Sequence, residues 1–440
     1  MKNVLLISPD FPQTYWQFAK AFRNNGANVF AIGGTDEDNL LPELRNCLTK
    51  YVCCKEMENL DIMYNIVGCI INEFGPIDYL ESNNEYWLQN DAKIREHFNI
   101  QSGIFPSQLE DFQRKSNLKK YYEDAGVKVA PYIIVDKYDD LLKFAEKFGY
   151  PLFIKPDTGV GASGNYKIHN IEELNEFFHC KNNKFPYICE TFVASKYIRT
   201  FDGICDSNSN VVVCDSMVFP PSIFEVKEKG EDLFYYVDKK IDDDFAKLGS
   251  RVIKSMGLKN RIFHAEYFVA DNDCPGYFSK GDYIGIEVNI RAPGGYTPDL
   301  INFGISANIY QVLADVVCFG KTSIVKGKPY YCCCASRRNN KQYFFNNDDI
   351  LRTYRNEVCF NGFYPFIFSD IMGDQFYMAK FETFKDMMIF NEYVGRLANM
   401  TYSTPTFFNK LIGEDAKIMR EQNENISNQE SICDKHIDGA

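Results

Sequence analysis

The sequence predicts a protein of the α/β and α+β classes, with an N-terminal parallel α/β domain, a two-lobed middle region and a small C-terminal α/β lobe. From the first residues onward, short apolar runs alternate with stretches of helical spacing. After about residue 197, longer alternating runs are typical of antiparallel strands. The 440 residues are enough for several domains of roughly 100–200 residues each.

The N-terminal domain is expected over residues 1–105. Residues 3–8 form an apolar run, residues 13–25 have helical spacing that Gly26 ends, and residues 28–33 form a second apolar run. This order predicts a βαβ unit. The remaining expected elements of this domain are strands 51–54 and 77–81 and a helix at about 58–74.

The middle region, residues 106–320, is expected to have a small lobe at about 126–192 and a large lobe at about 193–320. A helix at 115–125 precedes the small lobe, whose expected elements are strands 132–135, 151–155, 165–169 and 186–190 and helices 138–148 and 171–179. Those of the large lobe are a hairpin over 197–218, helices 243–256 and 305–318, and strands 262–269 and 283–289.

The C-terminal lobe is expected over residues 321–413, with strands 329–336 and 376–381 and a helix at 383–396. Residues 414–440 are polar and rich in Asn, Gln and Glu, so we expect a disordered tail.

Composition restricts the class of protein. Lys and Arg number 48 against 60 Asp and Glu, a net charge of −12, which disfavours a nucleic-acid partner. The 15 cysteines do not form a disulfide framework, and we expect most to be buried thiols in a reducing compartment. The N-terminal apolar run is too short for a signal peptide and no run approaches a membrane span, so we expect a cytoplasmic protein without a membrane partner.

Two glycine motifs resemble nucleotide-binding sequences but lack their context. Residues 159–164 match Gly-x-Gly-x-x-Gly, yet they lead into a strand, whereas a dinucleotide site needs this loop to open a helix. We therefore interpret them as a flexible flap between two strands. Gly320-Lys321-Thr322 has Asp315 where a P-loop needs its first glycine, and it follows a helix.

Two lysines and one acid are placed to bind a nucleotide. Lys155 ends a strand directly before the glycine loop, and Lys115 opens a helix, so both could reach the phosphates of ATP. Glu190 ends another apolar strand, where it could accept from the amino group of adenine while the following backbone pairs with the ring. The alternatives are a solvated lysine at a strand end and a solvated acid on an edge strand.

The most informative segment is a pair of strands that carry acids. Alternation places Glu287, Asn289 and Arg291 on one strand face, and Glu266 joins them if strands 262–269 and 283–289 pair. Two carboxylates and an amide suit magnesium that bridges phosphates, and Arg291 suits the charge of a transferred phosphoryl group. The alternative is a solvated sheet face, which rarely carries this pattern directly before Ala-Pro-Gly-Gly.

This order of motifs resembles the ATP-grasp superfamily, and within it the carboxylate–amine ligases. The resemblance covers roughly residues 1–320, so that 1–105 would be a pre-ATP-grasp domain, and its most specific motif is IEVNIRAPGG at 286–295. It assigns ATP to Lys115, Lys155, Gly159, Gly161, Ala162, Ser163, Gly164, Glu190, Thr191, Phe192 and Val193. It assigns Mg²⁺ or Mn²⁺ to Glu266, Glu287 and Asn289, and catalysis to Arg291. The acid that members often use for the ribose is missing, with Asp202 as a weak substitute.

The resemblance implies that the enzyme converts a carboxylate into an acyl phosphate with Mg-ATP and joins it to an amine, releasing ADP and phosphate. Its partners would be these small molecules, and a homodimer is an open option. The alternatives are a biotin-carboxylase-like enzyme and a non-catalytic ATP-binding protein of the same fold. Tyr296, Arg337 and Arg338 are candidates for binding the anionic substrate, unless the two arginines are solvated surface charges.

Overall fold

The computed structural model describes residues 1–158, 164–182, 184–220, 226 and 229–398. The predicted flap residues Gly159, Gly161, Ala162 and Ser163 lie outside the described residues, and so does the predicted tail 414–440.

The N-terminal domain is built on a parallel sheet, as predicted, in the strand order β3-β2-β1-β4. Its strands are β1 (Asn3–Ile7), β2 (Asn28–Gly33), β3 (Lys50–Cys53) and β4 (Tyr79–Glu81). Its helices are α1 (Trp16–Asn24), α2 (Pro42–Arg45), α3 (Leu60–Phe74) and α4 (Leu88–His97), with short 3₁₀ turns η1 (Glu37–Asn39) and η2 (Glu85–Trp87). Strands β1, β2 and β4 are almost entirely buried, which explains their apolar residues, whereas the edge strand β3 is only partly buried.

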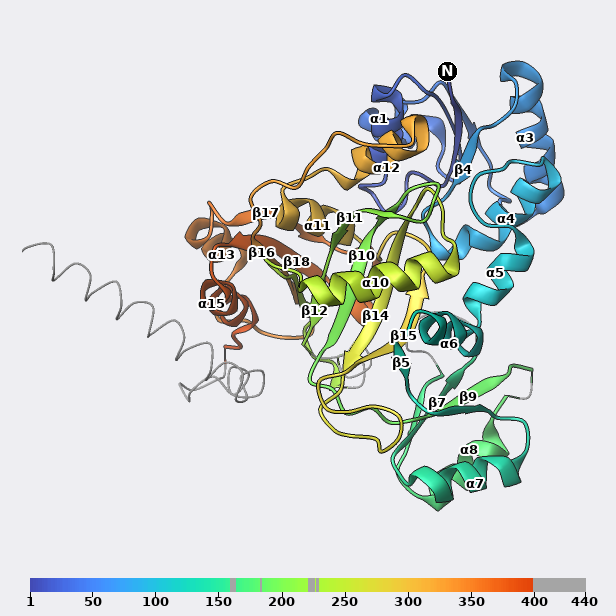
Figure 1. Cartoon of the computed structure of the whole chain (residues 1–440). Helices are drawn as coiled ribbons and strands as arrows, with labels where there is room; N and C mark the ends of the chain where they lie inside the picture. The colour runs from blue at the N-terminus through green and yellow to red at the C-terminus, as the bar shows by residue number, and fades with distance from the viewer. Residues whose placement is uncertain (159–163, 183, 221–225, 227–228, 399–440) are drawn as a thin grey trace, which may run out of the picture.

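The small lobe, at the bottom of Figure 1, is an antiparallel sheet in the order β6-β9-β7-β8. Its elements are β6 (Tyr132–Ile134), α7 (Tyr138–Phe148), β7 (Leu152–Pro156), β8 (Tyr166–Ile168), α8 (Ile171–Cys180) and β9 (Tyr187–Thr191). Leu152 and Ile154 pack into the core beneath the two helices. Because side chains alternate along a strand, Lys155 projects from the opposite face, where it pairs with Glu190 of β9.

A ten-stranded sheet forms the centre of the molecule (Figure 1). Its path runs β17-β18-β16-β13-β12-β10-β14-β15-β5, and β11 pairs with β10 outside this path. The strands are β5 (Lys128–Val129), β10 (Ile198–Cys205), β11 (Val211–Asp215), β12 (Met217–Phe219), β13 (Phe234–Val237), β14 (Arg261–Val269), β15 (Tyr283–Asn289), β16 (Tyr331–Arg337), β17 (Val358–Phe363) and β18 (Gln375–Phe381). The strands expected for the C-terminal lobe thus continue the central sheet, because β16 pairs with β13. The domain boundaries stay predictions.

Helices cover this sheet on both faces. They are α5 (Pro106–Gln113), α6 (Lys115–Asp124), α10 (Asp243–Met256), α11 (Thr297–Ile305), α12 (Ile309–Phe319), α13 (Asn347–Thr353), α14 (Ser369–Met372) and α15 (Phe384–Gly395), with the turn η3 (Phe366–Phe368). Helices α6 and α10 share a core with β10, β14 and β15, whereas α11 and α12 pack with α1 of the N-terminal domain in another core.

The helix expected at 305–318 is present as α12, although it begins later, at Ile309, and the preceding helix α11 was not predicted. The two helices are separate because Ser306 adopts a left-handed conformation (φ 49°) that ends α11. Among the described residues no single helix meets the length and hydropathy of a membrane span. The α11–α12 pair meets them only jointly, across a bend of 93°.

Candidate active site

Strands β14 and β15 bring the predicted acids together. They pair antiparallel with Glu266 opposite Glu287 and His264 opposite Asn289. Tyr122 of α6 crosses beneath them and donates its hydroxyl to the backbone carbonyls of both glutamates, at 3.2 and 2.9 Å. Its ring fits there because Gly285 has no side chain: a Cβ at that position would lie 2.5 Å from the ring. The helix and the two strands thus fix the spacing of the carboxylates.

The charges of this carboxylate pair suit a cation. Burial raises the pKa of Glu287, and the neighbouring Glu266 raises it further, which is the signature of two like charges in one place. Asn289 donates to Glu287 at 3.2 Å, so its amide oxygen lies in the same cluster. No three His, Cys, Asp or Glu side chains of the described residues gather into a complete metal cage. Mg²⁺ does not need one, because it takes one or two carboxylates and completes its shell with water and phosphate. The residues fit that ion.

His264 orients Glu266, a role that the sequence interpretation missed. Its Nε2 lies 3.1 Å from Glu266, and its Nδ1 hydrogen-bonds Asp202 on the adjacent strand β10. Burial would lower the pKa of His264, but the two carboxylates outweigh it and raise the pKa to about 10. The imidazole is therefore charged at neutral pH and holds the carboxylate of Glu266 in place. The sequence contained a signal for this role, because His264 and Glu266 are two residues apart and therefore lie on the same face of a strand.

This arrangement corrects the weak prediction that Asp202 binds the ribose. Its carboxylate is 1% exposed and accepts from Thr200 as well as from His264. Both oxygens are thus occupied within the sheet, and the side chain has no face for a sugar.

Arg291 follows β15 and reaches across to the N-terminal domain. Its Nε donates to Glu85 of η2 at 3.1 Å, and its Nη1 donates to the carbonyl of Ala292 at 2.8 Å. Its Nη2 lies 3.5 Å from Asn289 Oδ1, so the guanidinium borders the carboxylate cluster. The sequence interpretation missed Glu85, because no local pattern relates residues 206 positions apart.

Lysines converge on Glu190 from two directions. Lys155 of β7 lies 2.8 Å from one carboxylate oxygen, and Lys119 of α6 pairs with the other. Burial raises the pKa of Glu190, but the two lysines outweigh it and bring the pKa to about 2. Lys115, one helical turn before Lys119, is 4.0 Å from Glu287. The helix α6 therefore places one lysine at the carboxylate cluster and one at Glu190. Lys119 was missed, although its spacing from Lys115 puts both on one helix face.

Glu190 and the backbone that follows it were predicted to hold adenine, but both oxygens of the Glu190 carboxylate pair with lysines in this structure. The N–H groups of Thr191 and Phe192 donate to the carbonyls of Pro131 and Pro151. We therefore expect the N–H of Val193 to be the group that meets adenine. The Val193 side chain is buried at the junction of the lobes, which would fix that backbone.

We expect Lys119→Met to raise the Kd for ATP about tenfold. Without Lys119, Glu190 would pair with Lys155 alone and draw it away from the phosphates, and a charged hydrogen bond is worth roughly 1.5–3 kcal/mol. Titration calorimetry with Mg-ATP measures the effect, and thermal unfolding monitors the fold. Lys147→Met, on the exposed side of α7, is the control. A folded variant with parental ATP affinity would contradict the role given to Lys119.

The residues proposed to bind the anionic substrate are engaged elsewhere, which corrects that prediction. The guanidinium of Arg337 is buried and donates to the carbonyls of Val394 and Phe345. Arg338 donates to three backbone carbonyls, including that of Ser369 in α14. Tyr296 is 2% exposed. These side chains hold their own region together, so none presents a fork or a hydroxyl to a ligand.

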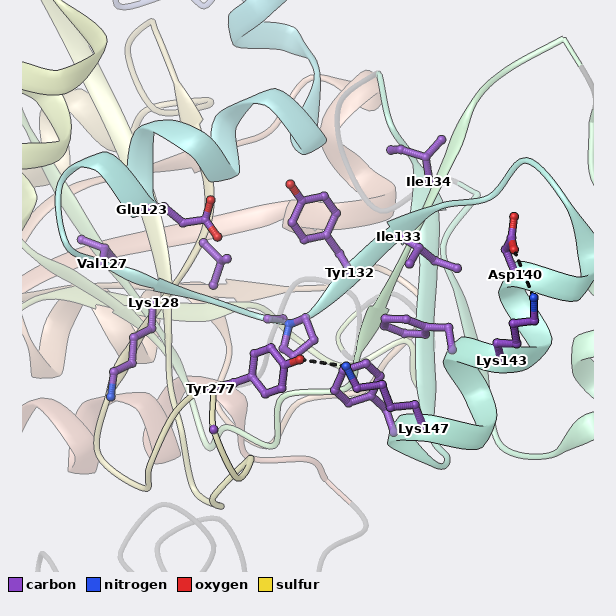
Figure 2. A pocket seen from close by; sticks show the side chains of 16 residues that line it. Glu123, Val127, Lys128, Tyr132, Ile133, Ile134, Asp140, Lys143, Lys147 and Tyr277 are labelled. Carbon is purple, nitrogen blue, oxygen red and sulfur yellow. Dashed lines mark hydrogen bonds and ion pairs between the residues drawn. The ribbon is translucent and has the colours of Figure 1, made fainter.

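Two cavities lie beside helix α6. A cavity of about 790 Å³ is lined by the connector between β5 and β6 and by side chains of α7 (Figure 2). There Lys147 and Tyr277 point toward each other and form a 3.1 Å hydrogen bond. A smaller cavity of about 390 Å³ is lined by catalytic candidates, among them Glu85, Lys115, Glu287 and Asn289. The smaller cavity is therefore the one that belongs to the site.

Comparison with known proteins gives the class. The family model of the ATP-grasp domain matches residues 120–273. The chain is 24% identical over 216 residues to the L-arginine-specific L-amino acid ligase of Bacillus subtilis, and 24% identical over 281 residues to the alanine–anticapsin ligase of Bacillus subtilis (strain 168). The alignments cover 47% and 58% of this chain. The crystal structure of an L-amino acid ligase from Bacillus licheniformis superposes with a TM-score of 0.65 at 15% identity, covering 90% of this chain and 97% of that one.

Residues 120–273 thus match an ATP-grasp domain, and the fold of the chain is that of the L-amino acid ligase structure. The chain spans 50% and 58% of the length of the two curated relatives. The predicted ATP-grasp domain and the predicted fold class are confirmed. The individual site residues stay predictions, which the geometry above supports or corrects.

Proposed function

We propose that the protein is an ADP-forming carboxylate–amine ligase that joins small carboxylic acids, amino acids among them, to an amine. The observation that carries this proposal is the pairing of Glu266 with Glu287 beside Arg291, with Lys115 of α6 4.0 Å from Glu287. The two ligases of Bacillus subtilis named above support the substrate class.

The proposed reaction has two steps. A carboxylate oxygen of the acid bonds to the γ-phosphorus of ATP as the bond to the β-phosphate oxygen breaks, giving an acyl phosphate and ADP. The amine nitrogen then bonds to the acyl carbon, phosphate leaves, and the nitrogen loses a proton. Mg²⁺, held by Glu266, Glu287 and Asn289, would neutralise phosphate charge.

The side chains of this chain have separate roles in these steps. Lys115 and Lys155 would bind the phosphates as point charges, and Glu190 keeps Lys155 in place until the nucleotide arrives. Arg291 would stabilise the negative charge on the transferred group and then on the oxygen of the tetrahedral carbon. Glu85 holds the guanidinium at that point. None of these steps needs a covalent enzyme nucleophile.

We expect ADP and phosphate to form in a fixed ratio to an amide product. The protein is incubated with Mg-ATP and pairs of acids and amines drawn from the amino acids, and phosphate release is measured beside mass spectrometry of the products. A pair that yields one phosphate for each amide bond supports the proposal. Release of phosphate without formation of an amide for every pair would count against the proposal. Absence of turnover with every pair and with bicarbonate would count against it as well.

A further inference from the structure

A fully buried cluster of charged side chains lies where the N-terminal domain meets the catalytic strands. It contains Glu81 at the end of β4, Asp91 and Arg95 of α4, and Arg261 at the start of β14. Each is 2% exposed or less. Buried charges pay a large desolvation cost and add little stability beyond a well-packed apolar core. Such a cluster is better suited to fixing a geometry than to stabilising a fold.

Glu81 is the centre of this cluster and joins the two parts of the molecule. One of its oxygens is 2.9 Å from Arg95 Nη2 and 2.8 Å from Arg261 Nη2. Arg95 belongs to the N-terminal domain and also donates to the carbonyls of Leu80 and Ile104. Arg261 belongs to the large lobe. The carboxylate therefore ties the last residue of β4 to the first residue of β14.

Both ends of this link lead to the catalytic guanidinium. Arg261 Nε donates at 2.8 Å to the carbonyl of Ile290, the residue directly before Arg291. On the other side, Glu81 begins the short loop to Glu85, and the N–H of Ser82 in that loop donates to Asp91 at 2.9 Å. Glu85 then accepts from Arg291 Nε. The contacts therefore form a closed chain of interactions that runs from Arg261 through Glu81 and the loop to Glu85, and returns through Arg291 and the Ile290 carbonyl.

We propose that Arg261 is a positioning residue, which sets Arg291 and Glu85 in register across the domain boundary. Its fork fixes the backbone at Ile290 with one nitrogen and the Glu81 carboxylate with another. A displacement of about 1 Å at a reacting group costs on the order of a hundredfold in rate. The inference rests on the proposed function, because it gives Arg291 its task in the reaction.

The N-terminal domain has a second attachment, which allows the role of Arg261 to be tested. Helix α1 packs against α12, Gln17 donates to Asp299 at 2.7 Å, and Asn25 donates to Asp315 at 2.9 Å. These contacts lie apart from the charged cluster. A change at Arg261 should therefore shift the Glu85–Arg291 pair without separating the domains.

The test is the Arg261→Lys variant, which keeps the positive charge but loses the guanidinium nitrogens that contact Ile290 and Glu81 separately. We expect kcat to fall ten- to a hundredfold, while the Kd for Mg-ATP stays within about twofold of the parent. In a Glu85→Gln background, whose Arg291 has already lost its charged partner, the same change should cost threefold or less. Parental kcat, a parallel loss of ATP affinity and melting temperature, or equal costs in both backgrounds would each overturn the positioning role.

A crystal structure of the Arg261→Lys protein provides a readout that needs no substrate. We expect the distance between Glu85 and the Arg291 guanidinium to lengthen while α1 stays packed on α12. An unchanged Glu85–Arg291 contact would overturn the inference. Absence of ligase activity in the parent would instead overturn the proposed function, and this structural comparison would still decide the role of Arg261.

Discussion

The Glu287→Gln protein is expected to lose ATP-dependent turnover by about a thousandfold or more. An amide in place of the carboxylate removes a charged ligand from the proposed magnesium site, and metal stabilisation of this kind contributes several kcal/mol, with each 1.36 kcal/mol worth a factor of ten. The fold should not suffer. Glu266 and Glu287 repel each other, as the raised pKa of Glu287 indicates, so the neutral side chain relieves a repulsion.

The test compares turnover and stability of the Glu287→Gln protein with those of a control variant. Phosphate release and thermal unfolding are measured for Glu287→Gln and for Glu382→Gln, whose carboxylate pairs with lysines on the surface. We expect the first variant to be inactive with a melting temperature at or above that of the parent, and the second to be active. Normal turnover in Glu287→Gln would remove Glu287 from the site.

Arg291→Lys is expected to lower kcat by about a hundred- to a thousandfold, with the Kd for Mg-ATP little changed. Loss of one aligned donor to a developing oxyanion costs roughly this much. Lysine keeps the charge, yet it lacks the planar guanidinium whose separate nitrogens donate to Glu85 and to the carbonyl of Ala292. The ammonium would therefore take another position relative to the transferred group.

Single-turnover measurement of ADP formation separates the chemical step from binding in this variant. We expect the slow step to be chemistry and the ATP titration to match the parent. A variant that turns over normally, or one whose whole loss appears in ATP affinity, would show that Arg291 does not stabilise the transition state.

The catalytic strands were predictable because their information is local. Alternation along 283–289 put Glu287 and Asn289 on one face, and the register of β14 with β15 confirms that Glu266 lies opposite Glu287. The helix that begins at Lys115 and the strand that ends near Lys155 also lie where the pattern predicted. The periodicity of a sequence indicates which side chains lie on the same face of a strand, and here one face holds most of the proposed catalytic and metal-binding residues.

The contacts that the sequence did not reveal join distant segments. Glu85 meets Arg291, and Glu81 meets Arg261, across a domain boundary that no periodic pattern describes. Arg337 shows the opposite error. An arginine at a strand end suggested an exposed fork, but tertiary packing buries it among aromatic rings and backbone carbonyls. Burial of a charged side chain depends on the partners that the fold supplies, and these are not neighbours in sequence.

We propose that Glu266, Glu287 and Asn289 bind a magnesium ion whose nucleotide lies between the small lobe and the central sheet. A crystal structure with Mg²⁺ and a non-hydrolysable ATP analogue tests it most directly. We predict a metal at ~2.0–2.1 Å from oxygens of Glu266 and Glu287, with phosphates beside Lys115 and Lys155 and Arg291 facing the γ-phosphate. A nucleotide bound elsewhere, in the cavity beside Tyr277 for instance, or a metal held by other side chains, would contradict the account.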